Sequence, residues 1–166
     1  MSTHAQTVAH LQHLGFTLRN PAALEGIDDD PWDVLTAWDE GGYAFDHVLS
    51  YDAEMVEDDD AYTAWVAEGA EATGRTAELT HLAGHTELDG NSWLEYTLAG
   101  TVRRTDFVQE GDWLVPEVAD AIIEDFRRVP GRTMLYLDNG QGGVFVWVPA
   151  EQVTAFAALF PEAEPA

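Results

Sequence analysis

Two apolar runs near the C-terminus, 134–137 and 144–148, flank the polar, glycine-rich segment 138–143. Short runs of this kind, joined by a connection that contains Asn-Gly, predict a β-hairpin. Neither run alternates with polar residues, and a strand that is apolar on both sides is usually covered on both faces. The pattern therefore places this hairpin near the middle of a sheet.

Apolar residues at helical spacing predict helices on either side of this hairpin and in the first half of the chain. One helix is expected before Gly15, and others over 32–39, 61–73, 115–128 and 150–160. The helix over 115–128 has Pro116 in its first turn and the arginines Arg127 and Arg128 in its last. Both features are typical of helix ends.

Alternation of apolar and polar residues predicts strands over 43–51, 76–82, 92–98 and 101–109. The last two are separated only by Ala99-Gly100, and a two-residue turn there fixes their register. It places Leu98 opposite Thr101, Tyr96 opposite Arg103 and Glu95 opposite Arg104.

The expected fold is α+β, with an antiparallel or mixed sheet of about five to six strands and helices packed on it. The 166 residues suit a single domain over 1–166, which is long enough to bury a large core. Only the tail, 161–166, which is rich in proline and glutamate, is expected to fray.

Composition excludes several broad classes of protein. No apolar run approaches the ~20 residues that a membrane-spanning helix requires, so no membrane association is expected. The N-terminus lacks the basic region and the apolar core of an export signal. The chain contains no cysteine, so it has neither disulfides nor thiolate chemistry. These features predict a cytoplasmic protein.

Charge is the strongest compositional signal. Thirty-one acidic residues face seven basic ones, which are all arginine, and the formal net charge is −24. Between Arg19 and Arg75 there are sixteen acidic residues and no basic residue. Such a field repels nucleic acid and anionic membranes and attracts a basic protein surface. The alternative is that the acidity serves only solubility or adaptation to salt, in which case carboxylates would cover the surface evenly.

Aromatic residues stand among these carboxylates, and two aspartate clusters directly precede predicted helices. Tryptophan and tyrosine within a polar rim are the usual composition of a binding hot spot, and carboxylates would steer a basic partner toward them. The predicted partner-binding residues are Asp28, Asp29, Asp30, Trp32, Asp33, Trp38, Asp58, Asp59, Asp60 and Tyr62. They are expected to lie on one negative face. The alternative is that the aromatics pack helices onto the sheet, while the aspartates favour the positive ends of those helices.

Signals for catalysis are weak. The chain lacks the patterns of serine hydrolases, P-loop proteins and dinucleotide-binding folds, and without lysine it cannot form a Schiff base. His81 and His85 have a spacing that aligns metal ligands on a helix, but Thr80, Gly84 and Thr86 favour a strand and a turn. No cofactor and no metal are therefore predicted. A metal-assisted hydrolase that uses His81, His85 and nearby carboxylates is the alternative function.

The function expected from the sequence is that of a non-enzymatic, acidic protein-binding module. It would cover a basic surface of its partner, such as the nucleic-acid site of a toxin or nuclease, without binding nucleic acid itself. Small acidic bacterial inhibitor and immunity proteins share this general character, although no motif of a particular family is present.

Overall fold

The computed structural model describes residues 4–166 and divides into two compact units. Unit 1 consists of the residues up to Ser50 together with Arg128–Ala166, and unit 2 is Tyr51–Arg127. A domain is a segment that can fold alone. The division into two compact units does not test whether either unit folds alone. The single domain expected over 1–166 therefore stays a prediction.

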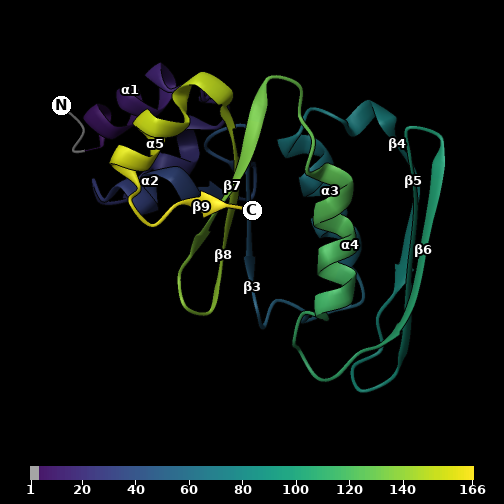
Figure 1. The fold of residues 1–166 in the computed structure, drawn as a ribbon. Helices are drawn as coiled ribbons and strands as arrows, with labels where there is room; N and C mark the ends of the chain where they lie inside the picture. The colour runs from purple at the N-terminus through teal and green to yellow at the C-terminus, as the bar shows by residue number, and fades with distance from the viewer. Residues whose placement is uncertain (1–3) are drawn as a thin grey trace. The chain divides into compact units, whose positions relative to one another are not determined.

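Unit 1 is built on a four-stranded sheet with the order β3-β8-β7-β9 (Figure 1). Its strands are β3 (Val48–Asp52), β7 (Arg132–Asp138), β8 (Gly142–Pro149) and β9 (Glu164–Pro165). The antiparallel pair β7 and β8 is the hairpin predicted from the two apolar runs, and it occupies the middle of the sheet as predicted. The neighbours Val146 and Trp147 point to opposite faces of β8 and are both fully buried, so the hairpin is covered on both sides.

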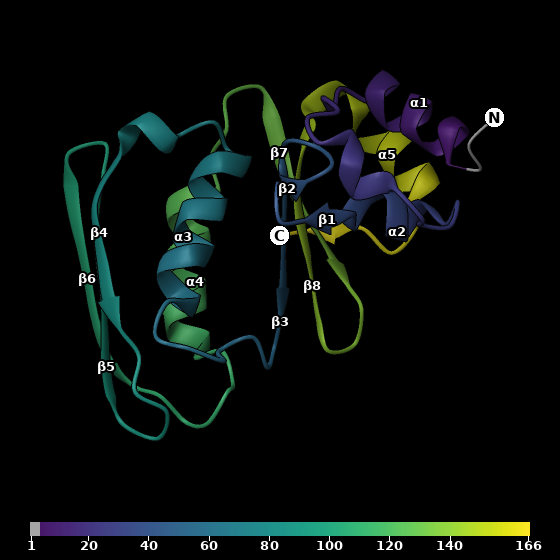
Figure 2. The same ribbon diagram turned by 180° about the vertical axis from the view of Figure 1, so that it is seen from behind.

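Helices pack on one face of this sheet (Figures 1 and 2). They are α1 (Ala5–His13), η1 (Pro21–Leu24), α2 (Pro31–Thr36), η3 (Ala150–Gln152) and α5 (Val153–Leu159). Leu11 of α1, Leu35 of α2 and Phe156 of α5 share one apolar core with Val146 and Val148 of β8. Each large side chain buried in this way contributes about 1.5–3 kcal/mol, so the core holds the helices on the sheet.

The C-terminal segment, which the sequence predicts to fray, carries the short strand β9. Its residues pair antiparallel with β7, with Pro165 opposite Leu135 and Glu164 opposite Tyr136. A proline is accommodated here because β9 lies at the edge of the sheet, where one side of the strand needs no backbone donor.

Two local predictions in unit 1 are wrong. The helix predicted over 32–39 ends at Thr36, and β1 (Trp38–Asp39) follows and pairs antiparallel with β2 (Gly42–Tyr43). The strand predicted over 43–51 is interrupted, because β2 ends at Tyr43 and β3 begins only at Val48. His47 lies in the gap with φ 59°, a left-handed conformation that breaks the alternation of a strand.

Unit 2 contains a three-stranded antiparallel sheet with two helices on one face (Figures 1 and 2). The elements are α3 (Ala61–Ala72), the 3₁₀ helix η2 (Thr76–Glu78), β4 (Leu79–His85), β5 (Asn91–Leu98), β6 (Thr101–Val108) and α4 (Pro116–Phe126). β5 lies in the middle, and its register with β6 is the one predicted from the Ala99-Gly100 turn. The ring of Phe107 on β6 lies 5.1 Å from that of Tyr62 on α3, so the odd-numbered positions of β6 face the helices.

The α+β class is confirmed, but a single sheet of five to six strands is not. Within residues 4–166, nine strands form three sheets of two, four and three strands. Alternation in the sequence identifies a strand and its local hairpin partner, whereas the joining of one hairpin to another depends on long-range packing. Here the strands of unit 2 form a sheet of their own, with α3 and α4 packed on one face of it (Figure 1). None of the helices within residues 4–166 is long and apolar enough to cross a membrane.

Asp125, in the last turn of α4, fastens that helix to the sheet of unit 2. Its carboxylate accepts hydrogen bonds from the Tyr96 hydroxyl at 2.7 Å and from Arg103 Nε at 2.8 Å. Its backbone carbonyl accepts a bond from Arg75 Nη1 at 2.7 Å. Burial first, and then the adjacent carboxylate, raise the pKa of Tyr96, so its hydroxyl stays protonated and remains a donor.

The turn between β5 and β6 offers a test of the predicted hairpin. Ala99 and Gly100 have φ 49° and 80°, and a two-residue turn with positive φ at both positions strongly prefers Asn-Gly. An alanine in the left-handed region costs about 1–2 kcal/mol, much of which asparagine avoids. Ala99→Asn is therefore expected to raise the free energy of unfolding by about 0.5–1 kcal/mol, seen as a higher urea midpoint at unchanged slope.

A matched control is Ala121→Asn at an exposed position of α4. Asparagine is the poorer helix former, so this variant is expected to lose about 0.5 kcal/mol. A midpoint for Ala99→Asn at or below that of the parent chain would contradict the proposed turn chemistry.

Candidate functional site

Three connecting segments meet at one end of unit 2, where α3 and α4 begin and β4 turns into β5 (Figure 1). We call them the acidic loop cluster, and they are residues 53–60, 86–90 and 109–115. Val56 N donates to Asp112 O at 3.0 Å, and Leu114 N donates to Ala53 O at 2.7 Å. These two bonds join the first segment to the third in the manner of a short strand pair.

The turn between β4 and β5 is attached to the same structure. Its Asp89 carboxylate accepts a hydrogen bond from Gly111 N at 2.8 Å, and its Gly90 carbonyl accepts one from Gln109 N at 2.9 Å. All three segments are therefore connected by hydrogen bonds, although they are far apart in the sequence.

A buried polar network beneath the surface fixes the shape of residues 109–115. The side chain of Gln109 is fully buried, and its Nε2 donates to Gly111 O at 2.9 Å and to Trp113 O at 2.6 Å. Its Oε1 accepts the Tyr62 hydroxyl at 2.9 Å, and that hydroxyl accepts Val115 N at 2.9 Å. Every polar atom of the amide and the phenol has a partner. A network satisfied in this way is rigid, because breaking any member leaves a buried polar group without a bond.

Burial raises the pKa of Tyr62, and the bond from the Val115 amide opposes this rise. The hydroxyl therefore stays protonated at neutral pH and donates to Gln109. Its role is structural, because the ring is almost completely buried and packs against Phe107.

The network presents one large aromatic side chain to solvent. Trp113, whose backbone carbonyl is bound by Gln109, is 55% exposed. Leu88, in the turn between β4 and β5, is also exposed. Two apolar side chains therefore stand on a surface whose other members are mostly charged.

Carboxylates dominate the rest of the acidic loop cluster. Eight acidic residues in these segments are exposed: Glu57, Asp58, Asp59, Asp60, Glu87, Asp89, Glu110 and Asp112. The three segments contain no arginine. The positive ends of α3 and α4 lie here and offset part of the negative charge.

Some of these carboxylates bond to neighbouring backbone amides or to a histidine. Asp58 accepts a hydrogen bond from Asp60 N at 3.0 Å. One oxygen of Asp59 accepts Thr86 N at 2.5 Å and lies 3.0 Å from His85 Nδ1. These bonds shape the turn before α3, but they leave the outer oxygens of the cluster facing water.

The first predicted aspartate cluster lies in unit 1 and is organised around the start of α2. Asp30 caps that helix by accepting Trp32 N at 2.9 Å, and Asp29 accepts the Thr7 hydroxyl at 3.1 Å. Trp32 is half-buried against the core, whereas Trp38 is 56% exposed. The remaining predicted residues, Asp28 and Asp33, are exposed.

The structure brings the predicted residues together in two groups. Asp28, Asp29, Asp30, Trp32, Asp33 and Trp38 belong to unit 1, and Asp58, Asp59, Asp60 and Tyr62 belong to unit 2. Tyr62 is buried, and its hydroxyl bonds Gln109 beneath the loop. The exposed aromatic of unit 2 is Trp113, which the sequence reasoning missed. The signal was the run Glu110-Gly111-Asp112-Trp113, in which a tryptophan follows two acids in a turn.

The two histidines of the hydrolase alternative do not converge. His81 and His85 lie on β4, where residues four apart are separated by about 13 Å along an extended strand. His81 has φ 53° at an irregularity of the strand, and His85 turns toward Asp59. Among residues 4–166, no group of three or more His, Cys, Asp or Glu side chains is placed to hold a metal ion. The geometry therefore lends no support to a metal-assisted hydrolase.

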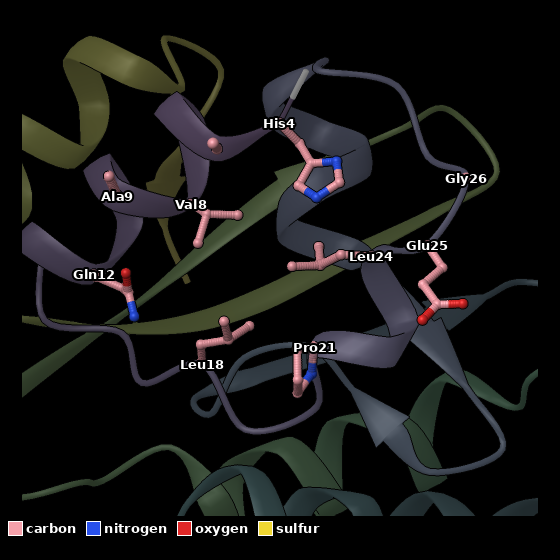
Figure 3. Close-up of a pocket in the computed structure, with 10 residues that line it drawn as sticks. His4, Val8, Ala9, Gln12, Leu18, Pro21, Leu24, Glu25 and Gly26 are labelled. Carbon is pink, nitrogen blue, oxygen red and sulfur yellow. The ribbon is translucent and has the colours of Figure 1, made fainter. Parts of the chain in front are cut away.

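Unit 1 carries an open groove of about 420 Å³ between α1 and η1 (Figure 3). Val8, Leu18 and Leu24 give it an apolar lining, and His4, Gln12 and Glu25 supply polar groups. It contains one carboxylate and one imidazole, so it lacks the two carboxylates that glycoside hydrolysis requires.

Comparisons with known proteins identify no relative. No protein-family model matches the chain, and neither a curated protein nor a solved structure matches it.

The buried network beneath the acidic loop cluster can be tested with Tyr62→Phe. Removing the hydroxyl leaves the Gln109 carbonyl and the Val115 amide without a partner, and each orphaned group costs about 1–3 kcal/mol. We expect a lower free energy of unfolding in urea, and faster amide hydrogen exchange confined to residues 109–115. Exchange in the β7–β8 hairpin of unit 1 serves as the internal control. Unchanged exchange over 109–115 would show that the network does not order this loop.

Proposed function

We propose that this chain is a non-enzymatic protein-binding module, and that its acidic loop cluster docks onto a basic surface of another protein. The observation that carries the proposal is Trp113, an exposed aromatic side chain on a hydrogen-bonded loop, surrounded by carboxylates. As an inhibitor or immunity-type protein, the chain would use this surface to cover a basic site of its partner, such as the nucleic-acid site of a nuclease.

Rigidity supports the role of Trp113 as an anchor. Its loop is bound through two backbone carbonyls by the buried Gln109 amide, so little conformational entropy is lost when a partner covers the indole. Tryptophan is one of the residue types enriched at interface hot spots, where truncation typically costs about 2 kcal/mol or more.

The negative charge of the acidic loop cluster supports a basic partner. Two carboxylates about 6 Å apart in water repel each other by about 0.7 kcal/mol, and this surface gathers eight of them without an arginine. The repulsion gains nothing for the isolated chain, and a cationic partner would relieve it. The same field would steer that partner toward the site and accelerate association.

Salt or solubility adaptation is the competing explanation for the acidity. Both units are acidic, with twelve acids and three arginines in unit 1 (formal charge −9) and nineteen acids and four arginines in unit 2 (−15). Adaptation accounts for a charge distributed over both units. It does not account for an exposed tryptophan on a loop whose backbone is bound by a buried hydrogen-bond network.

Two matched tryptophan variants test the proposal. Proteins captured from cells that make this chain would be purified, and their affinity measured against the parent chain, Trp113→Ala and Trp38→Ala. The two indoles are almost equally exposed, at 55% and 56%, and both lie among acids. We expect Trp113→Ala to weaken binding by roughly 30-fold, the equivalent of 2 kcal/mol, and Trp38→Ala to leave it unchanged.

Salt dependence completes the test. The affinity should fall as salt rises, because the screening length shrinks from about 10 Å at 0.1 M to about 3 Å at 1 M. If only Trp38→Ala lost binding, the docking surface would lie on unit 1 and not at the acidic loop cluster. Equal affinities for all three chains would refute the proposal and favour adaptation.

A further inference from the structure

β6 is an edge strand with an open outer side. It pairs only with β5 in its sheet, and most of its eight residues are exposed. Its register with β5 is unbroken from Asn91↔Val108 to Leu98↔Thr101, and it contains no proline. Proteins usually block such edges with prolines, bulges, short strands or charged side chains, because free backbone groups recruit another strand. β6 lacks the first three of these devices, and the charges on its outward-bonding positions, Arg104 and Asp106, have opposite signs.

The opposite edge of the sheet differs. β4 has a bulge between Thr80 and Ala83, and His81 lies inside it in the left-handed region with φ 53°. A bulge bends a strand and strengthens its twist, which disrupts pairing along its outer side. The sheet of unit 2 therefore has one regular edge and one irregular edge.

The register identifies which residues of β6 bond outward. Gln109, one step beyond the strand in the same register, donates its N–H to Gly90 O on the β5 side at 2.9 Å. In an antiparallel pair the bonded positions recur at every second residue, so the odd-numbered residues of β6 bond toward β5. The even-numbered residues direct their N–H and C=O groups to the free edge, and they are Val102, Arg104, Asp106 and Val108.

The side chains of these even-numbered residues share the face of the sheet that the helices leave open. Val102 and Val108 are 62% and 59% exposed, which is unusual for valine. Arg104 lies over the ring of Trp93 at 4.4 Å and reaches Asp106 at 2.8 Å. The order along the strand is apolar, positive, negative, apolar.

We propose that β6 pairs antiparallel with β6 of a second copy of this chain, around a two-fold axis at Thr105. In this register Val102 faces Val108 of the second copy, and Arg104 faces its Asp106. Both apolar residues gain an apolar neighbour, and each arginine gains a carboxylate directly across the new ladder. All four residues bond outward, so the pairing uses the N–H and C=O groups that β5 leaves free.

Self-complementarity is the reason for choosing a second copy as the partner. A two-fold axis requires that each position match the one it meets, and the order apolar, positive, negative, apolar satisfies this at both pairs. An unrelated strand would satisfy it only by coincidence. The pairing does not involve Trp113, so it stands independently of the proposed docking function.

Charge exchange between copies is the decisive test. Arg104→Asp places aspartate opposite aspartate, and Asp106→Arg places arginine opposite arginine, so each variant alone should be monomeric. A mixture of the two restores both opposite-charge pairs and should form a heterodimer. Sedimentation equilibrium over a range of concentrations would measure this, with a mass of 18.3 kDa for a monomer and twice that for a dimer. The parent chain should dimerise, and Trp113→Ala should dimerise as well.

A single thiol provides a second measurement that does not depend on charge. The chain has no cysteine, and residue 105 would face its own copy in a non-hydrogen-bonded pair with Cα atoms about 4.5 Å apart. This separation is within disulfide range, so Thr105→Cys should form a covalent dimer under mild oxidation. Thr97→Cys, on the central strand β5, is the matched control and should stay monomeric.

Several results would overturn the proposal. They are a parent chain that is monomeric at all concentrations, single charge variants that still dimerise, a mixture that stays monomeric, or a Thr105→Cys chain that does not cross-link. Pairing of β6 with a strand of a different protein, in the absence of self-association, would also count against it.

Discussion

Scarcity of positive charge is the constraint on which this structure depends. Seven arginines must serve a chain with thirty-one acids, and three of them, Arg75, Arg103 and Arg132, join separate segments. Arg132 binds Trp147 O at 2.9 Å and Gly15 O at 2.9 Å, and so joins the central hairpin to the end of α1. Arg75 and Arg103 converge on Asp125 from different elements. These three arginines thus stabilise contacts within each unit.

The elements that the sequence predicts well are those fixed by neighbours in the chain. The register of β5 and β6 follows from two residues, Ala99 and Gly100, because a short turn leaves no freedom in the pairing. The β7–β8 hairpin follows from apolar runs on either side of a glycine-rich turn. The arrangement of the strands into sheets is not predicted in this way, and the chain places them in separate sheets. Local sequence patterns do not indicate which hairpins will join into one sheet.

In the candidate site, the roles of single residues likewise depend on long-range contacts that the sequence pattern does not reveal. Tyr62 is aromatic, near acids and at the start of a helix, and only its bond to Gln109, 47 residues away, makes it a buried support. Trp113 owes its position to the same network. The aspartate clusters were recognisable because residues adjacent in sequence stay adjacent in space. Their division between two units follows from the tertiary fold, and this could not be read from their spacing.

The bulge in β4 decides how far any association through the sheet of unit 2 can proceed. A sheet with two regular edges can add copies at both ends, and the result is an open polymer of the amyloid kind. In this sheet the backbone around His81 is irregular, whereas β6 has a regular outer side for strand addition. If β6 pairs with a second copy as proposed, growth would stop after one addition, and a strand edge that is a fibrillation hazard in other proteins would give a closed assembly of fixed size.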